Sequence, residues 1–183
     1  MPRRTAAEVD RRLTLMGRDL ALFYPGPYGW WEDADLDVTL PTRANGPTDI
    51  AVVDGVTAAA QLFVNRLKTH HGELAPLGHP EYGSRHHELI GQPNVERTRA
   101  LLKLYVLECL SHEPRIAKIR RCDVTPGPDR STVRIVLDVE VAGEATPLLL
   151  VVPFNFAVGF EGADAPTPVA VLPAGAPGTG GAR

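Results

Sequence analysis

Six histidines are the side chains of this chain best suited to bind a metal ion or to move a proton. None belongs to an HExxH pattern, and the two cysteines, Cys109 and Cys122, form no CxxC pair. Adjacent histidines on a helix also point to different faces. We therefore expect no metal site and no cofactor, and we predict exposed or loop-packing positions for His70, His71, His79, His86, His87 and His112.

Carboxylates could support glycoside hydrolysis if two of them were held a few ångströms apart around a cleft. The candidates are Glu73, Glu81, Glu88 and Glu113, and nothing in their spacing selects a pair. The chain also has no GxSxG motif, no Cys/His signature and no phosphate loop. We therefore expect that the chain has no catalytic residue and that the protein is not an enzyme. The alternative is a cell-wall glycosidase of the lysozyme type.

Segment 115–121 is rich in lysine and arginine and could contact phosphates. The whole chain, however, has a formal net charge of −3 at pH 7, whereas nucleic-acid-binding domains are typically basic. We interpret the segment as a solvated or protein-binding strand, and we expect no nucleic-acid partner.

Glu113, Pro114 and Arg115 place opposite charges around a proline that should end a helix. The two charges leave the helix end in fixed directions and need not pair with each other. One interpretation is an exposed helix terminus. The other is a pair of anchors for charges elsewhere in the domain or on a neighbouring subunit, since a rigid arginine can bind a carboxylate through two parallel hydrogen bonds. The residues alone do not choose between them.

Two apolar stripes with a helical period come before this motif. The first predicts a helix over 56–67, with Asp54 as its N-cap. The second predicts a helix over 94–112, with Asn94 as its N-cap. Between them we expect a short helix over 84–90, ended by Gly91.

After Pro114 the apolar period changes from 3.6 to 2. This change predicts strands over 120–125, 133–141 and 148–156. Helices first and strands last indicate an α+β fold, with N-terminal helices packed on a small C-terminal antiparallel β-meander. The last strand is apolar on both faces over 148–152, which favours a covered sheet or a partner interface.

The 183 residues suit one domain with flanking segments. Residues 1–48 contain an expected helix over 6–22, which Gly17 weakens, and an extended acidic stretch over 32–37. Residues 49–160 form the expected α+β domain. Residues 161–183 are rich in glycine, proline and alanine, so we expect a flexible tail.

The composition limits the cellular environments in which we expect the protein to occur. The chain is 44% hydrophobic and 22% charged, which are ordinary globular values. No apolar run approaches the length needed to span a bilayer, so we expect no membrane partner. The basic start, 1–4, is not followed by an apolar segment, so we expect no secretory signal. Two cysteines suit a reduced, cytosolic setting.

Three motifs carry a family resemblance. Segment 67–73 is similar to the pattern RL-T-x-x-GE, segment 77–85 to LGHPxYGSR, and segment 113–116 contains the signature EPR. Together they resemble the baseplate wedge, or sheath-initiator, family of contractile phage tails, which includes the T-even phage wedge protein and TssE of type VI secretion. The likeness covers about 49–154 and is strongest to the branch of phage-tail-like contractile injection systems. The sequence departs from the family at His87 and in its tail.

The resemblance implies a structural component of the inner baseplate, present in multiple copies around a sixfold assembly. Its partners would be the other baseplate wedge proteins, the inner tube or hub proteins and the sheath protein, whose first ring would pair with its terminal β element. The implied location is cytoplasmic, within an assembled contractile particle, and the resemblance leaves open whether that particle acts in the cell or after release.

The motifs and the strand pattern together select residues for structural or interaction roles. They are Gly72, Glu73, Tyr82, Gly83, Ser84, Arg85, Glu113, Pro114, Arg115, Leu149 and Val151.

Overall fold

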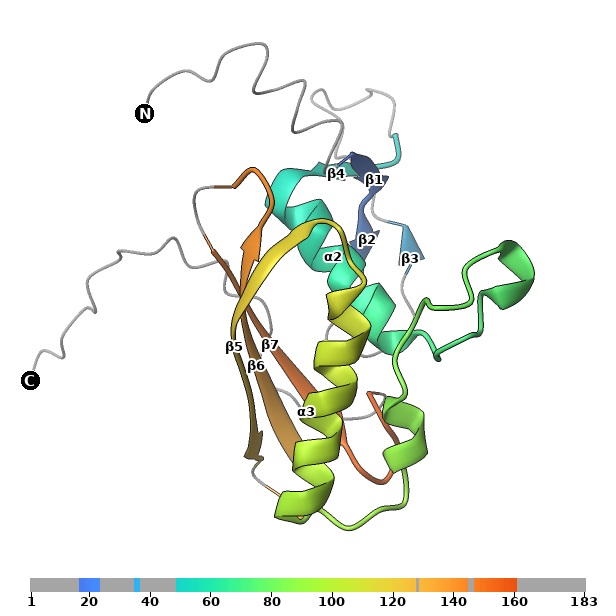
Figure 1. Ribbon diagram of the computed structural model, residues 1–183. Coiled ribbons are helices and arrows are strands. Elements are labelled where there is room, and N and C mark those ends of the chain that lie inside the picture. The colour runs from blue at the N-terminus through green and yellow to red at the C-terminus, as the bar shows by residue number, and fades with distance from the viewer. Residues whose placement is uncertain (1–16, 24–34, 37–48, 128, 145–146, 161–183) are drawn as a thin grey trace, which may run out of the picture.

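The computed structural model describes residues 17–23, 35–36, 49–127, 129–144 and 147–160. These residues combine helices with antiparallel sheets, as the expected α+β class requires (Figure 1). The elements in chain order are β1 (Arg18–Leu20), β2 (Leu22–Phe23), β3 (Asp35–Leu36), β4 (Val52–Asp54), α2 (Gly55–Lys68), η1 (Ala75–Leu77), η2 (His86–Leu89), α3 (Glu96–Ser111), β5 (Ile116–Pro126), β6 (Thr132–Val141) and β7 (Leu148–Asn155).

Helix α2 lies where its apolar stripe predicted it. Asp54 occupies the N-cap position, but its side chain makes no capping hydrogen bond. Thr69 ends the helix in an extended conformation, and both its backbone N–H and its hydroxyl donate to the carbonyl of Asn65. The stripe buries Phe63, Val64 and Leu67.

Helix α3 begins at Glu96, one residue later than an N-cap at Asn94 would place its start. The N-cap is Val95, and Asn94 is not the cap. The Asn94 side chain instead donates to the carbonyl of Thr132 and accepts from Arg99, because the start of α3 lies beside the β5–β6 turn. The helix ends at Ser111, just before Pro114, as the proline predicted.

The main sheet is antiparallel, with strand order β5-β6-β7. Strand β5 is longer than the expected 120–125 and begins directly after Arg115. Its pairing with β6 has two register irregularities, between Ile116 and Lys118 and between Ile119 and Arg121. The pairing of β6 with β7 runs without a shift from Thr132–Asn155 to Val139–Leu148.

Helices α2 and α3 lie on the same side of this sheet (Figure 1). The core forms between the two helices and the sheet. It is made of every second residue of β6 and β7 and of the apolar stripes of the helices. Each large apolar side chain buried there contributes about 1.5–3 kcal/mol. The largest fully buried side chains are Phe63, Leu67, Leu102, Val106, Leu110, Val133, Ile135, Leu137, Leu148, Leu150 and Phe154.

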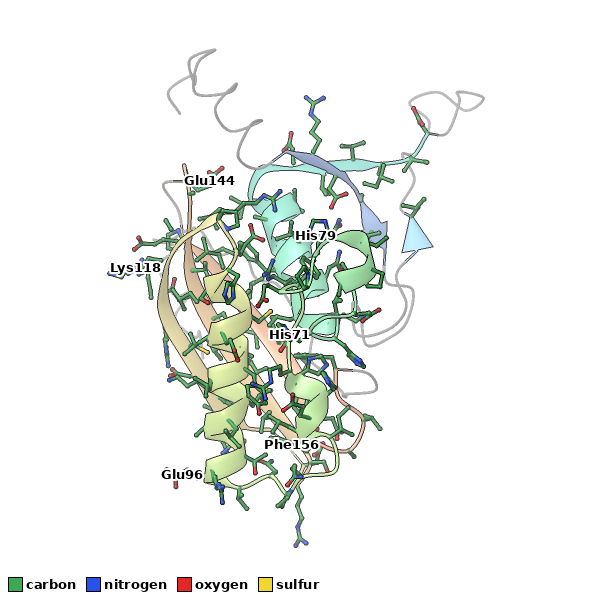
Figure 2. All side chains as sticks on the ribbon, turned by 45° about the vertical axis from the view of Figure 1, so that its right-hand side comes forward. His71, His79, Glu96, Lys118, Glu144 and Phe156 are labelled. Atoms are coloured by element: carbon green, nitrogen blue, oxygen red, sulfur yellow. The ribbon has the colours of Figure 1, made fainter. Side chains whose placement is uncertain are left out.

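The opposite face of the sheet carries charged and half-buried apolar side chains. Lys118 points away from the helices on this side (Figure 2). Arg120 lies 3.8 Å from Asp138 and 3.7 Å from Glu140, so these charges are paired across β5 and β6.

The N-terminal region corrects one expectation and agrees with another. The described part of the expected helix over 6–22 forms strands, because Gly17 adopts a positive φ of 67° and the chain then pairs with distant segments. Strand β1 pairs antiparallel with β4, and β2 with β3. Gln61 of α2 holds this region by accepting from Leu22 N–H and donating to the carbonyl of Leu20. The described part of the acidic stretch, Asp35–Leu36, is extended as predicted.

The segment between α2 and α3 is irregular. The expected short helix over 84–90 is a single 3-10 turn, η2, followed by Ile90 in an extended conformation.

Neither α2 nor α3 is both long and apolar enough to cross a membrane, and the same holds for every other helix within the described ranges. The expected tail, 161–183, lies outside the described residues.

Candidate functional site

Glu113 lies at the junction between α3 and β5, and its side chain is only 4% exposed. One oxygen, Oε1, accepts from the backbone N–H of Arg115 at 3.1 Å and from its Nη1 at 3.3 Å. Pro114 stands between the two residues and prevents a further helical turn. The charges around the proline therefore pair with each other, and the burial of Glu113 is inconsistent with the first interpretation, an exposed helix terminus.

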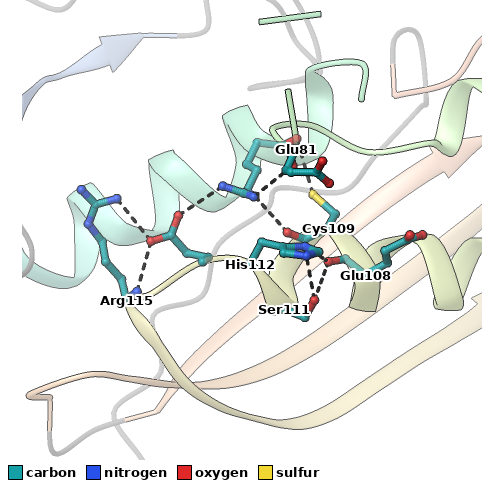
Figure 3. Close-up of polar contacts among 8 residues, drawn as sticks. Glu81, Glu108, Cys109, Ser111, His112 and Arg115 are labelled. Carbon is teal, nitrogen blue, oxygen red and sulfur yellow. Dashed lines mark hydrogen bonds and ion pairs between the residues drawn. The ribbon is translucent and has the colours of Figure 1, made fainter. Parts of the chain in front are cut away.

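Arg66 of α2 contacts the other oxygen of Glu113. Its Nη1 lies 3.6 Å from Oε2, its Nε donates to the carbonyl of Cys109 at 2.9 Å, and its Nη2 donates to the carbonyl of Glu81 at 3.4 Å (Figure 3). The guanidinium thus joins α2 to the last turn of α3 and to the preceding loop. Arg66 is buried because it follows Phe63 by three positions on the same helix face.

Tyr82 and Cys109 complete the surroundings of Arg66. The guanidinium carbon of Arg66 lies 4.7 Å from the centre of the Tyr82 ring, a cation–π distance. Burial raises the pKa of the Tyr82 hydroxyl above its usual value, and Arg66 opposes that shift. Burial also raises the pKa of the Cys109 thiol to about 11, so this sulfur is a thiol and a poor nucleophile at neutral pH.

The loop that carries Tyr82 is closed by backbone hydrogen bonds. Ser84 N–H donates to the carbonyl of Thr69, and Gly72 N–H donates to the carbonyl of Tyr82. Gly83 adopts a φ of 100°, and a Cβ there would lie 2.4 Å from the carbonyl oxygen of His70. Only glycine allows this close approach. The LGHPxYGSR-like segment therefore positions the aromatic ring over Arg66.

Glu73 and Arg85 have separate local roles. The Glu73 carboxylate accepts from the backbone N–H of His70 and closes the turn after α2. Arg85 forms two hydrogen bonds with Glu88, and its guanidinium lies 4.7 Å from the ring centre of Tyr105. These contacts join η2 to α3. Neither residue belongs to the group Arg66, Tyr82, Cys109, Glu113 and Arg115, which we call the junction network.

The junction network is built for rigidity. Both oxygens of Glu113 are engaged by arginines, and the cavity beside Cys109 has a volume of about 50 Å³, which is room for one or two water molecules. Within the described ranges, no group of three or more histidine, cysteine or acidic side chains is placed to hold a metal ion. The arrangement ties α2, the loop that carries Glu81 and the α3–β5 junction to one another.

Leu149 and Val151 lie in a different place, on β7. Phe156 N–H donates to the carbonyl of Ser131, on the β6 side, and Asn155 N–H donates away from β6 to Gly159. Backbone groups alternate along a strand, so the regular register turns those of Leu149 and Val151 away from β6. Among the described strands β7 pairs with β6 alone, and neither of these two N–H groups donates to a backbone carbonyl elsewhere in the described residues. Pro153 is also at a position of β7 whose backbone groups face away from β6, but proline has no N–H to donate.

No family model, no curated protein and no solved structure matches this chain. The features of the chain that bear on function are the motifs, the junction network and the edge of β7.

The sequence reasoning missed Arg66, the residue that connects the junction network. Two signals could have found it. The RL at the start of the RL-T-x-x-GE pattern aligns its arginine with Arg66, and the apolar stripe containing Phe63 and Leu67 has this one charge within it. A charged residue on the buried face of a helix requires a partner of opposite charge.

Proposed function

We propose that this chain is a structural component of the inner baseplate of a contractile injection system. It binds neighbouring wedge subunits and the tube or hub proteins, and it starts sheath assembly by pairing a β-strand with the first sheath ring. It works as a scaffold and not as an enzyme, in multiple copies around a sixfold assembly inside a cytoplasmically assembled particle. The motifs around Glu113 and Tyr82 support the family, and the edge of β7 supports the mode of binding.

The outward edge of β7 is the observation that carries the proposal. The N–H groups of Leu149 and Val151 point away from β6 and have no partner among the described residues. An added strand uses such groups for affinity. Pro153 and the bond from Asn155 to Gly159 end the available ladder on one side. The edge therefore offers a short site for one extended segment.

The other edge of the sheet is unsuited to strand addition. Strand β5 carries Lys118, Arg120 and Arg121 as exposed side chains, and its register is irregular at two places. Charges and bulges on an edge strand are common means of preventing strand pairing. In contrast, β7 has no charged residue from Leu148 to Asn155. The difference between the edges favours β7 as the docking strand.

The side chains on β7 suit the same role. Leu149 and Val151 are half-buried on the face of the sheet opposite the helices, beside Val136 and Asp138 of β6. A partner strand would continue this face and cover their remaining exposed surface. Affinity would then come from the backbone, and register from these two apolar side chains.

The junction network holds the sheet relative to the helices. Glu113 and Arg115 lie directly before β5, and the Arg115 carbonyl accepts from Ala142 N–H at the end of β6. A pull on β7 passes through β6 to this junction and then through Arg66 to α2. We propose that the network keeps the docking strand in place while the sheath polymerises.

The variant Val151→Pro tests the proposal. It removes an outward N–H and leaves the bonds between β6 and β7 intact, so the purified protein should keep its far-ultraviolet circular dichroism. Baseplates assembled with this variant should fail to grow sheath, as seen by negative-stain electron microscopy with the sheath protein of the same genome.

Two matched variants complete the test. Val151→Thr keeps the N–H and the branched side chain, so sheath should grow. Val152→Pro removes an N–H that points toward β6, so the protein itself should lose stability. Normal sheath growth on Val151→Pro baseplates would disprove strand pairing at this edge.

A further inference from the structure

Three histidine rings from two segments meet between the end of α2 and η2. The rings of His70 and His87 are stacked, with centres 4.4 Å apart and an interplanar angle of 23°. The His86 ring lies edge-on to both, at 5.8 Å from His70 and 5.9 Å from His87. We call His70, His86 and His87 the histidine cluster.

His86 is the buried member of the histidine cluster, with 3% of its surface exposed. Its ring packs edge-on against Phe160, at 4.4 Å, and against Phe154 of β7, at 5.9 Å. Its Nδ1 is buried and has no hydrogen-bond partner among the described residues, and the same is true of Nδ1 of His87. His86 therefore joins η2 to the end of β7 through ring packing.

The nearby charged groups do not compensate a proton on His86. The aromatic rings that face it from β7 and the following turn carry no charge, and His70 and His87 are imidazoles that would repel it. Glu88, on η2, is engaged by Arg85 and by the hydroxyl of Tyr105 of α3. The carboxylate nearest His70 is that of Glu73, which accepts from the His70 backbone N–H.

We propose that the histidine cluster is an acid-sensitive latch that holds residues 83–90 against the end of β7 at neutral pH and releases them in mild acid. His86 can take up a proton only when its ring leaves Phe154 and Phe160 for water. The inference concerns the stability of this loop and does not depend on the proposed baseplate function.

The direction of the pH effect follows from the buried ring. Burial first, and then His70 and His87, lower the pKa of His86 from 6.5 to about 3 in the closed state. A group whose pKa falls on burial stabilises the closed state above its ordinary pKa and loses that effect as the pH falls. The loss therefore begins near pH 6.5 and continues toward pH 3.

The size of the effect follows from the uptake of one proton. Between about pH 7.5 and about pH 5.5, the open population should rise about tenfold if only His86 is protonated on opening.

Hydrogen exchange measured by mass spectrometry tests the latch. The amides of Ser84, Glu88, Ile90 and Gly91 are hydrogen-bonded in the closed state. Their protection, corrected for the intrinsic exchange rate, should fall about tenfold between about pH 7.5 and about pH 5.5. Peptides from the middle of α3 should keep their protection over the same range.

Two substitutions separate the latch from general acid effects. His86→Phe keeps an aromatic ring and removes the titrating group, so loop protection should no longer depend on pH. His79→Phe changes an exposed histidine outside the cluster, so the pH dependence should remain. Equal pH dependence in His86→Phe and in the unchanged protein would overturn the proposal.

A nuclear magnetic resonance titration of the unchanged protein gives an independent test, which stands even if His86→Phe fails to fold. The His86 ring of the closed state should show no protonation at about pH 5.5. A His86 ring that titrates at its ordinary pKa while the loop amides stay protected would also overturn the latch.

Discussion

Arg66 and Glu113 form a buried ion pair between α2 and the α3–β5 junction, with Nη1 and Oε2 3.6 Å apart. Their side chains are 7% and 4% exposed. Both side chains are almost fully buried, so Arg66 depends on Glu113 and on the carbonyls of Cys109 and Glu81, and Glu113 depends on Arg66 and Arg115. This dependence makes the pair a sensitive place to test the fold.

Arg66→Ala should destabilise the protein by about 3–5 kcal/mol, because it leaves the Glu113 carboxylate buried with fewer partners. It also frees the Cys109 carbonyl that Arg66 Nε contacts. Urea denaturation followed by circular dichroism measures the loss. Arg85→Ala, which removes an exposed ion pair, is the control and should cost much less. Similar losses for the two variants would contradict this account.

Arg115→Ala should cost less stability than Arg66→Ala, since Glu113 keeps Arg66 and the backbone N–H of residue 115. A lost hydrogen bond to a charged group is worth about 1.5–3 kcal/mol. Under the proposed function the variant should still fail to join baseplates, as judged by co-sedimentation with wedge subunits. Arg115→Lys should assemble better than Arg115→Ala. An Arg115→Ala protein of unchanged stability that assembles normally would refute a role for this arginine.

Gly83→Ala should unfold the loop that holds Tyr82 over Arg66. The positive φ is strained for alanine, and the new Cβ would lie 2.4 Å from the His70 carbonyl oxygen. Gly78→Ala is the matched control, because Gly78 also has a positive φ but no atom within 4 Å of the added carbon. Strain alone costs about 1–2 kcal/mol. The melting temperature of Gly83→Ala should be well below that of Gly78→Ala. Equal melting temperatures would contradict the close approach of Gly83 to the His70 carbonyl.

We predict no glycosidase activity. The carboxylate of Glu113 is engaged by Arg66 and Arg115, and that of Glu73 accepts from a backbone N–H. Incubation of the purified protein with peptidoglycan, followed by measurement of released reducing sugar, checks this prediction. Activity that disappears in Glu73→Gln or Glu113→Gln would place the protein in the class of enzymes.

Local periodicity allowed several elements to be predicted from the sequence. The stripe around Phe63 marked α2, the proline at 114 marked the end of α3, and alternation over 133–141 marked β6. Each signal lies within a few residues of the element it describes. The same reasoning failed for residues 17–22, where an apparent helical stripe became strands through pairing with distant segments.

The sequence by itself determined α2, the end of α3 and the strand β6, and that Glu113 and Arg115 flank the proline that follows a helix. Only the tertiary structure decided that Arg66 reaches Glu113, that His86 is buried while His79 is exposed, and that Val151 N–H faces outward. The physical reason is range. Propensity and periodicity act between near neighbours along the chain, whereas burial, ion pairing and strand order depend on contacts between residues that are distant in sequence.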